Sequence, residues 1–214
     1  MIFKHPKTIF NNNFYKKNFF NSDFFYSPDG DGFYPNHHCK VSFNLAKPFI
    51  KNFRNAIDIG CRDGEFSRFL QNFFKHTFCF DPRTSTRFPG NVDLQKVSHF
   101  ACALGDKEET ITMTGGTHKI VLGKTYNTKC FKLDDFEFED IDFIKIDVEG
   151  FEKKVIQGAK NTIIKYNPLL VIEQNDVILP GDQKFSAINY LELTFGYKIV
   201  AVCPRGFDYV MIKS

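Results

Sequence analysis

The sequence lacks any apolar run that approaches the roughly 20 residues needed to span a bilayer. A membrane-spanning protein is therefore not expected. Its first residues, MIFKHPKTIFNNNF, contain neither a continuous apolar stretch nor the small-residue cleavage site of a secretory signal. We expect a cytoplasmic protein, located in the cytoplasm of the host cell if the source is a virus.

Tryptophan is absent and arginine is scarce, with 6 arginines against 22 lysines, whereas phenylalanine occurs 27 times in 214 residues. These residues, with the many asparagines, have A/T-rich codons, so the bias points to the source genome and not to a chemistry. The net charge is only +3 and the basic residues are spread along the chain, so nucleic acid is not the expected partner. A hydrophobic fraction of 43% and a charged fraction of 25% exclude a wholly disordered or fibrous protein.

The six cysteines form no CxxC pair, which disfavours both a zinc site and a redox motif. Most of them lie in or beside strand-like or glycine-rich segments, where a free cysteine behaves as a small buried hydrophobe. We predict free thiols in a reducing compartment. His37 and His38 beside Cys39 have no second ligand cluster near them in the sequence, so we predict no metal site there.

Two segments differ in composition. Residues 1–38 are rich in Phe, Asn, Lys and Tyr without helical or alternating periodicity, and we expect an irregular arm that packs on the domain or on a partner. Residues 39–214 are expected to form one domain. This domain begins with a helix-like segment at 39–53, with a boundary near Pro48. The arm could serve as a dimer contact, a lid or a docking peptide.

From residue 55 onward, short apolar segments alternate with helical patterns, which predicts an α/β fold with a parallel sheet buried on both faces. The last two strands are separated by PRGF, which is too short for a crossover, so they must pair antiparallel. Strands are expected at residues 55–60, 76–81, 96–104, 109–113, 141–147, 168–173, 197–203 and 208–213, and helices at 65–74, 152–166 and 185–195.

The strongest motif is AIDIGCRDGEFSRFL at residues 56–70, in which a strand is followed by a loop with Gly60 and Gly64 and then by a helix. Glycines there let a ligand lie against bare amides at the helix N-terminus. The spacing matches neither GxGxxG nor the Walker loop. Because the loop carries Asp58, Asp63 and Glu65, it favours a ligand with positive charge over a pyrophosphate. The alternative is an ordinary strand-to-helix turn.

Two further strand ends carry acids. Asp81, in FCFDP, follows Gly60 by 21 residues, a spacing typical of an acid that binds ribose hydroxyls, although a turn or cap residue is the alternative. In IDFIKIDVEGFE, Lys145, Asp147 and Glu149 alternate and would share one face.

Glu173 ends the following strand, so it should converge with Asp147 and Glu149 on one rim. Such carboxylates could bind Mg²⁺ or Ca²⁺ or supply a general base, or they could form a salt-bridged strand with a helix-capping acid. His118, in TGGTHK, is a second candidate base, or else a solvated loop histidine.

The chain resembles the FkbM-type methyltransferases, which are class I S-adenosylmethionine-dependent enzymes. The resemblance is carried by six segments in this order: IDIGCRDGEFS, FCFDP, ACALGDKEETITM, KLDDF, IDFIKIDVEGFEKKVIQGA and NPLLVIE. The resemblance covers roughly residues 55–175, and IKIDVEGFE is its most specific part. It implies a Rossmann-like, seven-stranded, mostly parallel sheet with an antiparallel C-terminal strand and helices on both faces. It also implies a cofactor that carries a sulfonium cation. Cys61-Arg62 departs from the small residues that are common in the family.

The resemblance also assigns roles. Asp58, Gly60, Cys61 and Gly64 would lie at the methionine part of S-adenosylmethionine, Asp81 at the ribose, and Ala103 and Leu104 at the adenine with Asp106 nearby. Asp147 would lie beside the transferred methyl group, and Glu149 and Glu173 would face the acceptor.

The expected function is O-methylation of a sugar or glycan hydroxyl. Glu149 or Glu173 would remove the proton, directly or through a divalent cation, with His118 as the fallback base. Two alternatives stay open. One is a nucleic-acid (cap-type) methyltransferase that uses Lys4, Lys16 and Lys17 among aromatic residues. The other is a non-catalytic docking protein that keeps the fold.

Overall fold

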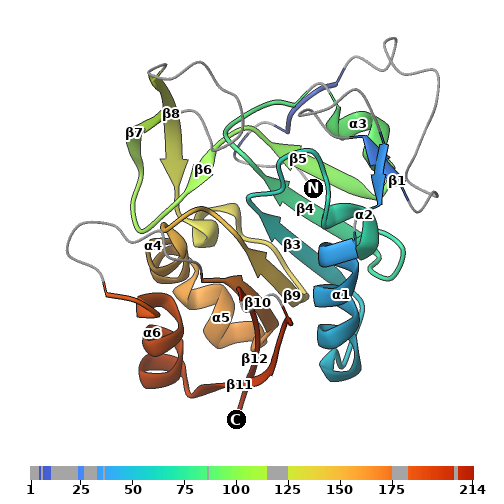
Figure 1. Cartoon of the computed structure of the whole chain (residues 1–214). Helices are drawn as coiled ribbons and strands as arrows, with labels where there is room; N and C mark the ends of the chain where they lie inside the picture. The colour runs from blue at the N-terminus through green and yellow to red at the C-terminus, as the bar shows by residue number, and fades with distance from the viewer. Residues whose placement is uncertain are drawn as a thin grey trace.

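The structure is a computed structural model, and it describes residues 5, 7–10, 24–26, 33–35, 37–85, 87–114, 125–174, 183–204 and 207–214. Its centre is a seven-stranded sheet with the strand order β11-β12-β10-β9-β3-β4-β5 (Figure 1). In chain order these strands are β3 (Asn55–Ile59), β4 (His76–Phe80), β5 (Val97–Phe100), β9 (Ile141–Ile146), β10 (Leu169–Glu173), β11 (Tyr197–Val202) and β12 (Asp208–Lys213).

The strands from β10 through β9, β3 and β4 to β5 are all parallel. Strand β12 runs antiparallel to both of its neighbours, β10 and β11. The connection between β11 and β12 is too short to cross over the sheet, so the chain must turn back on itself. The prediction of a mostly parallel sheet with an antiparallel C-terminal strand is confirmed.

Helices cover both faces of this sheet, as predicted (Figure 1). One face carries α1 (His37–Ala46), the 3-10 turn η2 (Lys47–Phe49), α2 (Ser67–Leu70) and α3 (Phe88–Asn91), and the other carries α4 (Glu152–Gly158), α5 (Lys160–Tyr166) and α6 (Ser186–Phe195). Because side chains alternate along a strand, Leu169 and Val171 of β10 pack in the core with α1. Leu170 and Ile172 pack in the core with α4, α5 and α6. None of the helices in the described part of the chain has the length and apolar character needed to cross a bilayer.

The expected helix at 152–166 is divided into α4 and α5 at Ala159. The break coincides with an external cap, because Asp134 in η3 (Leu133–Phe136) accepts hydrogen bonds from the backbone N–H groups of Asn161 and Thr162, each at 2.9 Å. Such bonds satisfy amides that a helix start leaves without partners. The expected helix at 65–74 is shortened to α2, with turns on either side. Pro48 lies in η2, directly after α1, as expected.

A second sheet was not predicted. It has the order β6-β8-β7 and consists of β6 (Ala103–Leu104), β7 (Glu109–Thr114) and β8 (Thr125–Phe131). The segment expected to be a single strand at 96–104 is thus divided, and only β5 belongs to the main sheet. A tight turn separates its halves, because the Cys102 N–H donates to the carbonyl of Phe100 at 3.0 Å. Strand β8 escaped prediction because its side chains are mostly exposed and form no apolar run.

The arm that was expected to be irregular contains two short strands, β1 (Phe24–Tyr26) and β2 (Phe33–Pro35), which pair antiparallel. Packing of the arm on the domain is confirmed for its described N-terminal residues. The Thr8 N–H donates to the carbonyl of His99 at 2.7 Å, and the ring of Phe10 stacks on Phe88. The boundary between arm and domain stays a prediction, although α1 begins at His37. Lys4, Lys16 and Lys17 lie outside the described residues.

Candidate active site

The strand order of the main sheet reverses between β3 and β9. From β3 the chain continues through β4 to β5, and it then returns to β9 and β10 on the other side of β3. Open α/β sheets bind ligands outside the carboxyl ends of the strands at such a switch point. A cavity of about 510 Å³ lies here, and its lining includes these predicted site residues: Asp58, Gly60, Cys61, Asp81, Ala103, Leu104, Asp147, Glu149 and Glu173.

The loop after β3 touches the end of β9 backbone to backbone. Gly60 has a φ of +82°, and a Cβ atom there would lie 1.7 Å from the carbonyl oxygen of Asp147. Its own N–H donates to the carbonyl of Phe80 at 2.8 Å. Gly64 also has a positive φ, of +85°, but it packs against Val92 and Phe88 of the α3 region instead of lining the cavity. Only glycine fits the contact at residue 60.

Asp58 lies under this loop and is only 1% exposed. One carboxylate oxygen accepts a hydrogen bond from the Ser67 hydroxyl at 2.5 Å. Burial raises the pKa of Asp58 to about 6, although Lys145 and the Ser67 hydroxyl act in the opposite direction. Asp58 thus orders the start of α2 and supplies negative charge below the cavity at neutral pH.

Asp81 follows β4 and is 4% exposed. Its carboxylate accepts hydrogen bonds from the backbone N–H groups of Arg62 at 3.0 Å and Arg83 at 2.8 Å. The Arg83 guanidinium lies 3.3 Å away. Asp81 therefore ties the loop after β3 to the loop after β4. It acts as a turn residue, as in the alternative interpretation, and it also lines the cavity.

The second sheet forms another wall of the cavity. Ala103 and Leu104 of β6 line it together with Met113 and Tyr126, so this side is largely apolar. Asp106 follows β6, the strand that contributes Ala103 and Leu104 to this wall. Burial raises the pKa of the nearby Cys130 thiol to about 11, with a further contribution from Asp106.

Lys145 and Asp147 form an ion pair at the end of β9, with 2.8 Å between Nζ and Oδ2, in which the Lys145 side chain is buried and the Asp147 side chain is 33% exposed. Lys145 is 4% exposed. Burial acts to lower its pKa, but Asp147 and the other nearby carboxylates outweigh burial and raise it. Burial acts to raise the pKa of Asp147, but Lys145 and a hydrogen bond from Glu173 outweigh burial and lower it. Both groups are therefore charged, and the predicted need for a partner is met within the chain.

The expected convergence of Asp147, Glu149 and Glu173 is confirmed, since their carboxylate oxygens lie within 4.8 Å of one another. Glu149 was expected to reach this rim by alternating with Lys145 and Asp147 along one strand, and that expectation is wrong. Strand β9 ends at Ile146, and Glu149 lies in the following turn with a φ of +56°. Glu152 caps that turn by accepting from the N–H groups of Val148 and Gly150, so the capping alternative also holds.

Glu173 ends β10, in register with Asp208 of β12. Burial and the hydrogen bond to Asp147 raise the pKa of Glu173, whereas Lys145 lowers the pKa of Asp147, so a proton shared by the two carboxyl groups is favoured on Glu173. Asp147, Glu149 and Glu173 lie close enough to hold one cation, and cation binding would require Glu173 to lose that proton, because a cation needs deprotonated ligands. His118 lies outside the described residues.

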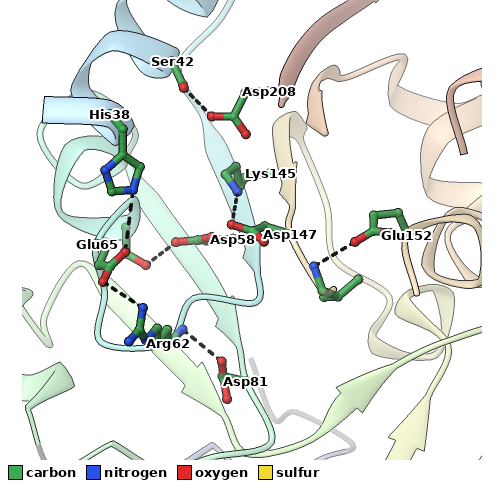
Figure 2. Close-up of polar contacts among 12 residues, drawn as sticks. His38, Ser42, Asp58, Arg62, Glu65, Asp81, Lys145, Asp147, Glu152 and Asp208 are labelled. Carbon is green, nitrogen blue, oxygen red and sulfur yellow. Dashed lines mark hydrogen bonds and ion pairs between the residues drawn. The ribbon is translucent and has the colours of Figure 1, made fainter. Parts of the chain in front are cut away.

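Four further residues belong to the site: His38, Arg83 and Asp208 were not predicted there, and Glu65 was predicted only as a loop acid. All four line the cavity. Glu65 contacts Nε2 of His38 at 4.0 Å and Nη1 of Arg62 at 3.6 Å (Figure 2). Asp208 accepts a hydrogen bond from Ser42. Asp208 could have been found, because the amino end of an antiparallel strand lies at the same edge as the carboxyl ends of parallel strands. In the sequence His38 was considered only as a metal ligand beside Cys39 and was dismissed because no second ligand was near, whereas the fold brings Glu65 to within 4.8 Å of both.

Comparisons with known proteins agree with this geometry. The 2-O-methyltransferase NoeI of Sinorhizobium fredii (strain NBRC 101917 / NGR234) is 28% identical over 207 residues, covering 81% of this chain and 84% of that protein. The solved methyltransferase FkbM from Methylobacillus flagellatus KT has a TM-score of 0.56 at 17% identity, covering 80% of this chain. The present chain spans about half (47%) of that structure.

A second solved structure, precorrin-6y C5,15-methyltransferase from Geobacter metallireducens GS-15, has a TM-score of 0.51 at 13% identity and covers 92% of this chain and 97% of its own. Residues 90–199 match the family model described as "Methyltransferase FkbM domain". This match covers just over half of the chain, and the protein therefore belongs to the FkbM family of methyltransferases.

Proposed function

We propose that the protein is an S-adenosylmethionine-dependent O-methyltransferase that acts on a sugar or glycan hydroxyl. The observation that carries the proposal is the cavity at the switch point between β3 and β9, where the bare backbone of Gly60 meets Asp147. This cavity combines acidic residues at one end with an apolar wall at the other. That combination suits a ligand with a cationic amino acid part and a flat apolar base.

The residues of the cavity fit this cofactor. The loop of Asp58, Gly60 and Cys61 would hold the methionine part, Asp81 the ribose, and Ala103 with Leu104 the adenine. When bound, the cofactor supplies an electrophilic methyl group on a sulfonium centre. The ionised Asp147, held by Lys145, would stabilise positive charge near that centre. By holding the acceptor oxygen in line, the cavity walls would supply much of the rate through proximity.

Glu149 and Glu173 are the proposed acceptor-side residues. Because the hydrogen bond to Asp147 uses the one proton that Glu173 would carry, Glu173 would accept a hydrogen bond from an acceptor hydroxyl through its other carboxyl oxygen. Glu149, beside it on the rim, would accept another. Two hydrogen-bond acceptors suit a polyhydroxylated acceptor better than an anionic one. The hydroxyl proton must also pass to a base, for which the sequence offered Glu149, Glu173 and His118. Of these, Glu173 is the weakest candidate, because its raised pKa favours the protonated form.

Support for O-methylation comes from the relative named 2-O-methyltransferase, and the sugar acceptor rests on family analogy. We place the reaction in the cytoplasm, and a divalent cation on the carboxylates of the rim is not part of the proposal. The N-terminal arm is proposed as a contact to a second copy or to another protein.

Calorimetric titration of S-adenosylmethionine and of its demethylated product tests the cofactor. Asp81→Asn is the test variant. Asp140→Asn is the matched control, because Asp140 is exposed and precedes β9 at the opposite edge of the sheet. We expect micromolar binding by wild type and control, and at least tenfold weaker binding by Asp81→Asn. If the folded wild-type protein binds neither compound, the proposal is wrong. Mass spectrometry of sugars and of capped RNA after incubation then identifies the acceptor.

A further inference from the structure

A histidine and a glutamate from distant parts of the sequence meet at the rim of the cavity. His38 lies in the first turn of α1, and Glu65 lies in the loop between β3 and α2. Nε2 of His38 is 4.0 Å from Oε2 of Glu65, and the side chains are 42% and 17% exposed (Figure 2). Both residues line the cavity that also holds Asp147 and Glu149. The histidine is thus open to solvent on one side and to the cavity on the other.

Glu65 sits in an environment that makes its carboxyl group titrate near neutrality. Burial raises the pKa of Glu65 to about 7, although the guanidinium of Arg62 acts in the opposite direction. An unperturbed imidazole titrates at roughly 6.5. A catalytic base is most effective when its pKa lies near the working pH, and an imidazole beside a carboxyl group that titrates there suits that role.

The other groups near the acceptor position are less suited to accept a proton. Asp147 is held as an ion pair by Lys145, and Glu173 already carries a proton on its hydrogen bond to Asp147. The cavity that His38 lines also carries Arg62 and Glu65 from the loop after β3, Glu149 after β9 and Asp208 at the start of β12, in addition to Lys145, Asp147 and Glu173. Carboxylates outnumber cations among them, so the cavity stabilises a positive charge on the imidazole ring.

We propose that His38 is the catalytic base of the methyl transfer and that Glu65 is its positioning residue. This inference rests on the proposed function and deepens it. The O–H bond of the acceptor breaks and its proton passes to the imidazole ring of His38, while an oxygen electron pair forms the new C–O bond. The C–S bond breaks, its electron pair stays on sulfur, and a neutral thioether results. The proton then leaves from the solvent-exposed imidazolium.

Steady-state kinetics on the full chain test the assignment, with His38→Gln, His38→Gly and Glu65→Gln as variants. His76→Gln and Glu192→Gln are the controls, because His76 begins β4 at the opposite edge of the sheet and Glu192 lies on the exposed side of α6. We expect kcat to fall about 100-fold or more in both His38 variants, with the KM for acceptor and the calorimetric Kd for S-adenosylmethionine within threefold of wild type.

Two readouts separate catalysis from a structural role. Added imidazole should restore turnover of His38→Gly but not of wild type. Glu65→Gln should shift the pH at which kcat reaches half of its maximum. Turnover of His38→Gln within threefold of wild type, or failure of imidazole to rescue His38→Gly, overturns this assignment alone. Absence of methyl transfer by the wild-type protein that still binds the cofactor overturns the proposed function and this assignment with it.

Discussion

The backbone of Gly60 lies so close to the carbonyl oxygen of Asp147 that a Cβ atom at residue 60 would approach that oxygen to 1.7 Å. This contact joins the end of β3 to the end of β9, the two strands between which the sheet reverses its order. It also sets the floor of the cavity.

Gly60→Ala should destabilise the protein strongly. The positive φ alone costs an alanine roughly 1–2 kcal/mol, and the Asp147 carbonyl is backbone that cannot move aside cheaply. Gly196→Ala is the matched control, because its φ is +68° but its nearest neighbour is Lys213 Nζ at 3.8 Å. Urea unfolding should show a larger loss for Gly60→Ala than for Gly196→Ala. Equal losses would contradict the contact.

Gly158→Ala should also destabilise the protein, against helix propensity. In an exposed helix this change stabilises by about 1 kcal/mol. At the end of α4, however, the new Cβ would lie 1.9 Å from the carbonyl oxygen of Gly105. The exposed neighbour Gln157 offers a control, since Gln157→Ala leaves this contact untouched. A stabilised Gly158→Ala variant in thermal unfolding would show that α4 does not pack on residue 105.

Asp58→Asn should change how stability depends on pH. Because burial raises the pKa of Asp58 to about 6, the folded state binds more protons than the unfolded state between about pH 4 and 6. This group therefore makes the protein more stable as the pH falls through that window. In urea unfolding at several pH values, Asp58→Asn should lack this contribution. A wild-type curve and a variant curve with the same slope would contradict the shift.

His99 should have the opposite effect. Burial lowers the pKa of His99 to about 4, so the unfolded state binds more protons between about pH 4 and 6.5, and stability falls as the pH is lowered through that window. His99→Asn should lose less stability on acidification than wild type. Thr8→Val removes the hydrogen bond between the Thr8 hydroxyl and Nδ1 of His99 but keeps the titrating ring, so it should retain the wild-type pH dependence.

The six cysteines are all buried and free, as predicted. Burial raises the pKa of Cys102 to about 12, which keeps its thiol protonated and unreactive. A thiol reagent should therefore react slowly with the native protein, and with six groups once the protein is unfolded in guanidinium without reductant. Fewer than six would indicate a disulfide.

Much of the fold could be predicted because its signals are local. The apolar segments β3, β4, β9 and β10 each end at a glycine, an acid or a turn, and the short connection before β12 permits only an antiparallel hairpin. The acids at the strand ends could be placed on one rim for the same reason, since parallel strands share an edge. Strand β8 was missed because its side chains are mostly exposed and give no apolar pattern.

The sequence by itself thus determined the α/β class, the family and the edge of the sheet at which Asp58, Asp81, Asp147 and Glu173 lie. Only the tertiary structure decided that Glu149 reaches Asp147 from a turn, and that His38 meets Glu65. It also decided which groups carry protons, because burial and the charge of Lys145 set the state of Asp147 and Glu173. Desolvation and long-range contacts depend on how the elements pack against one another, which local periodicity does not encode.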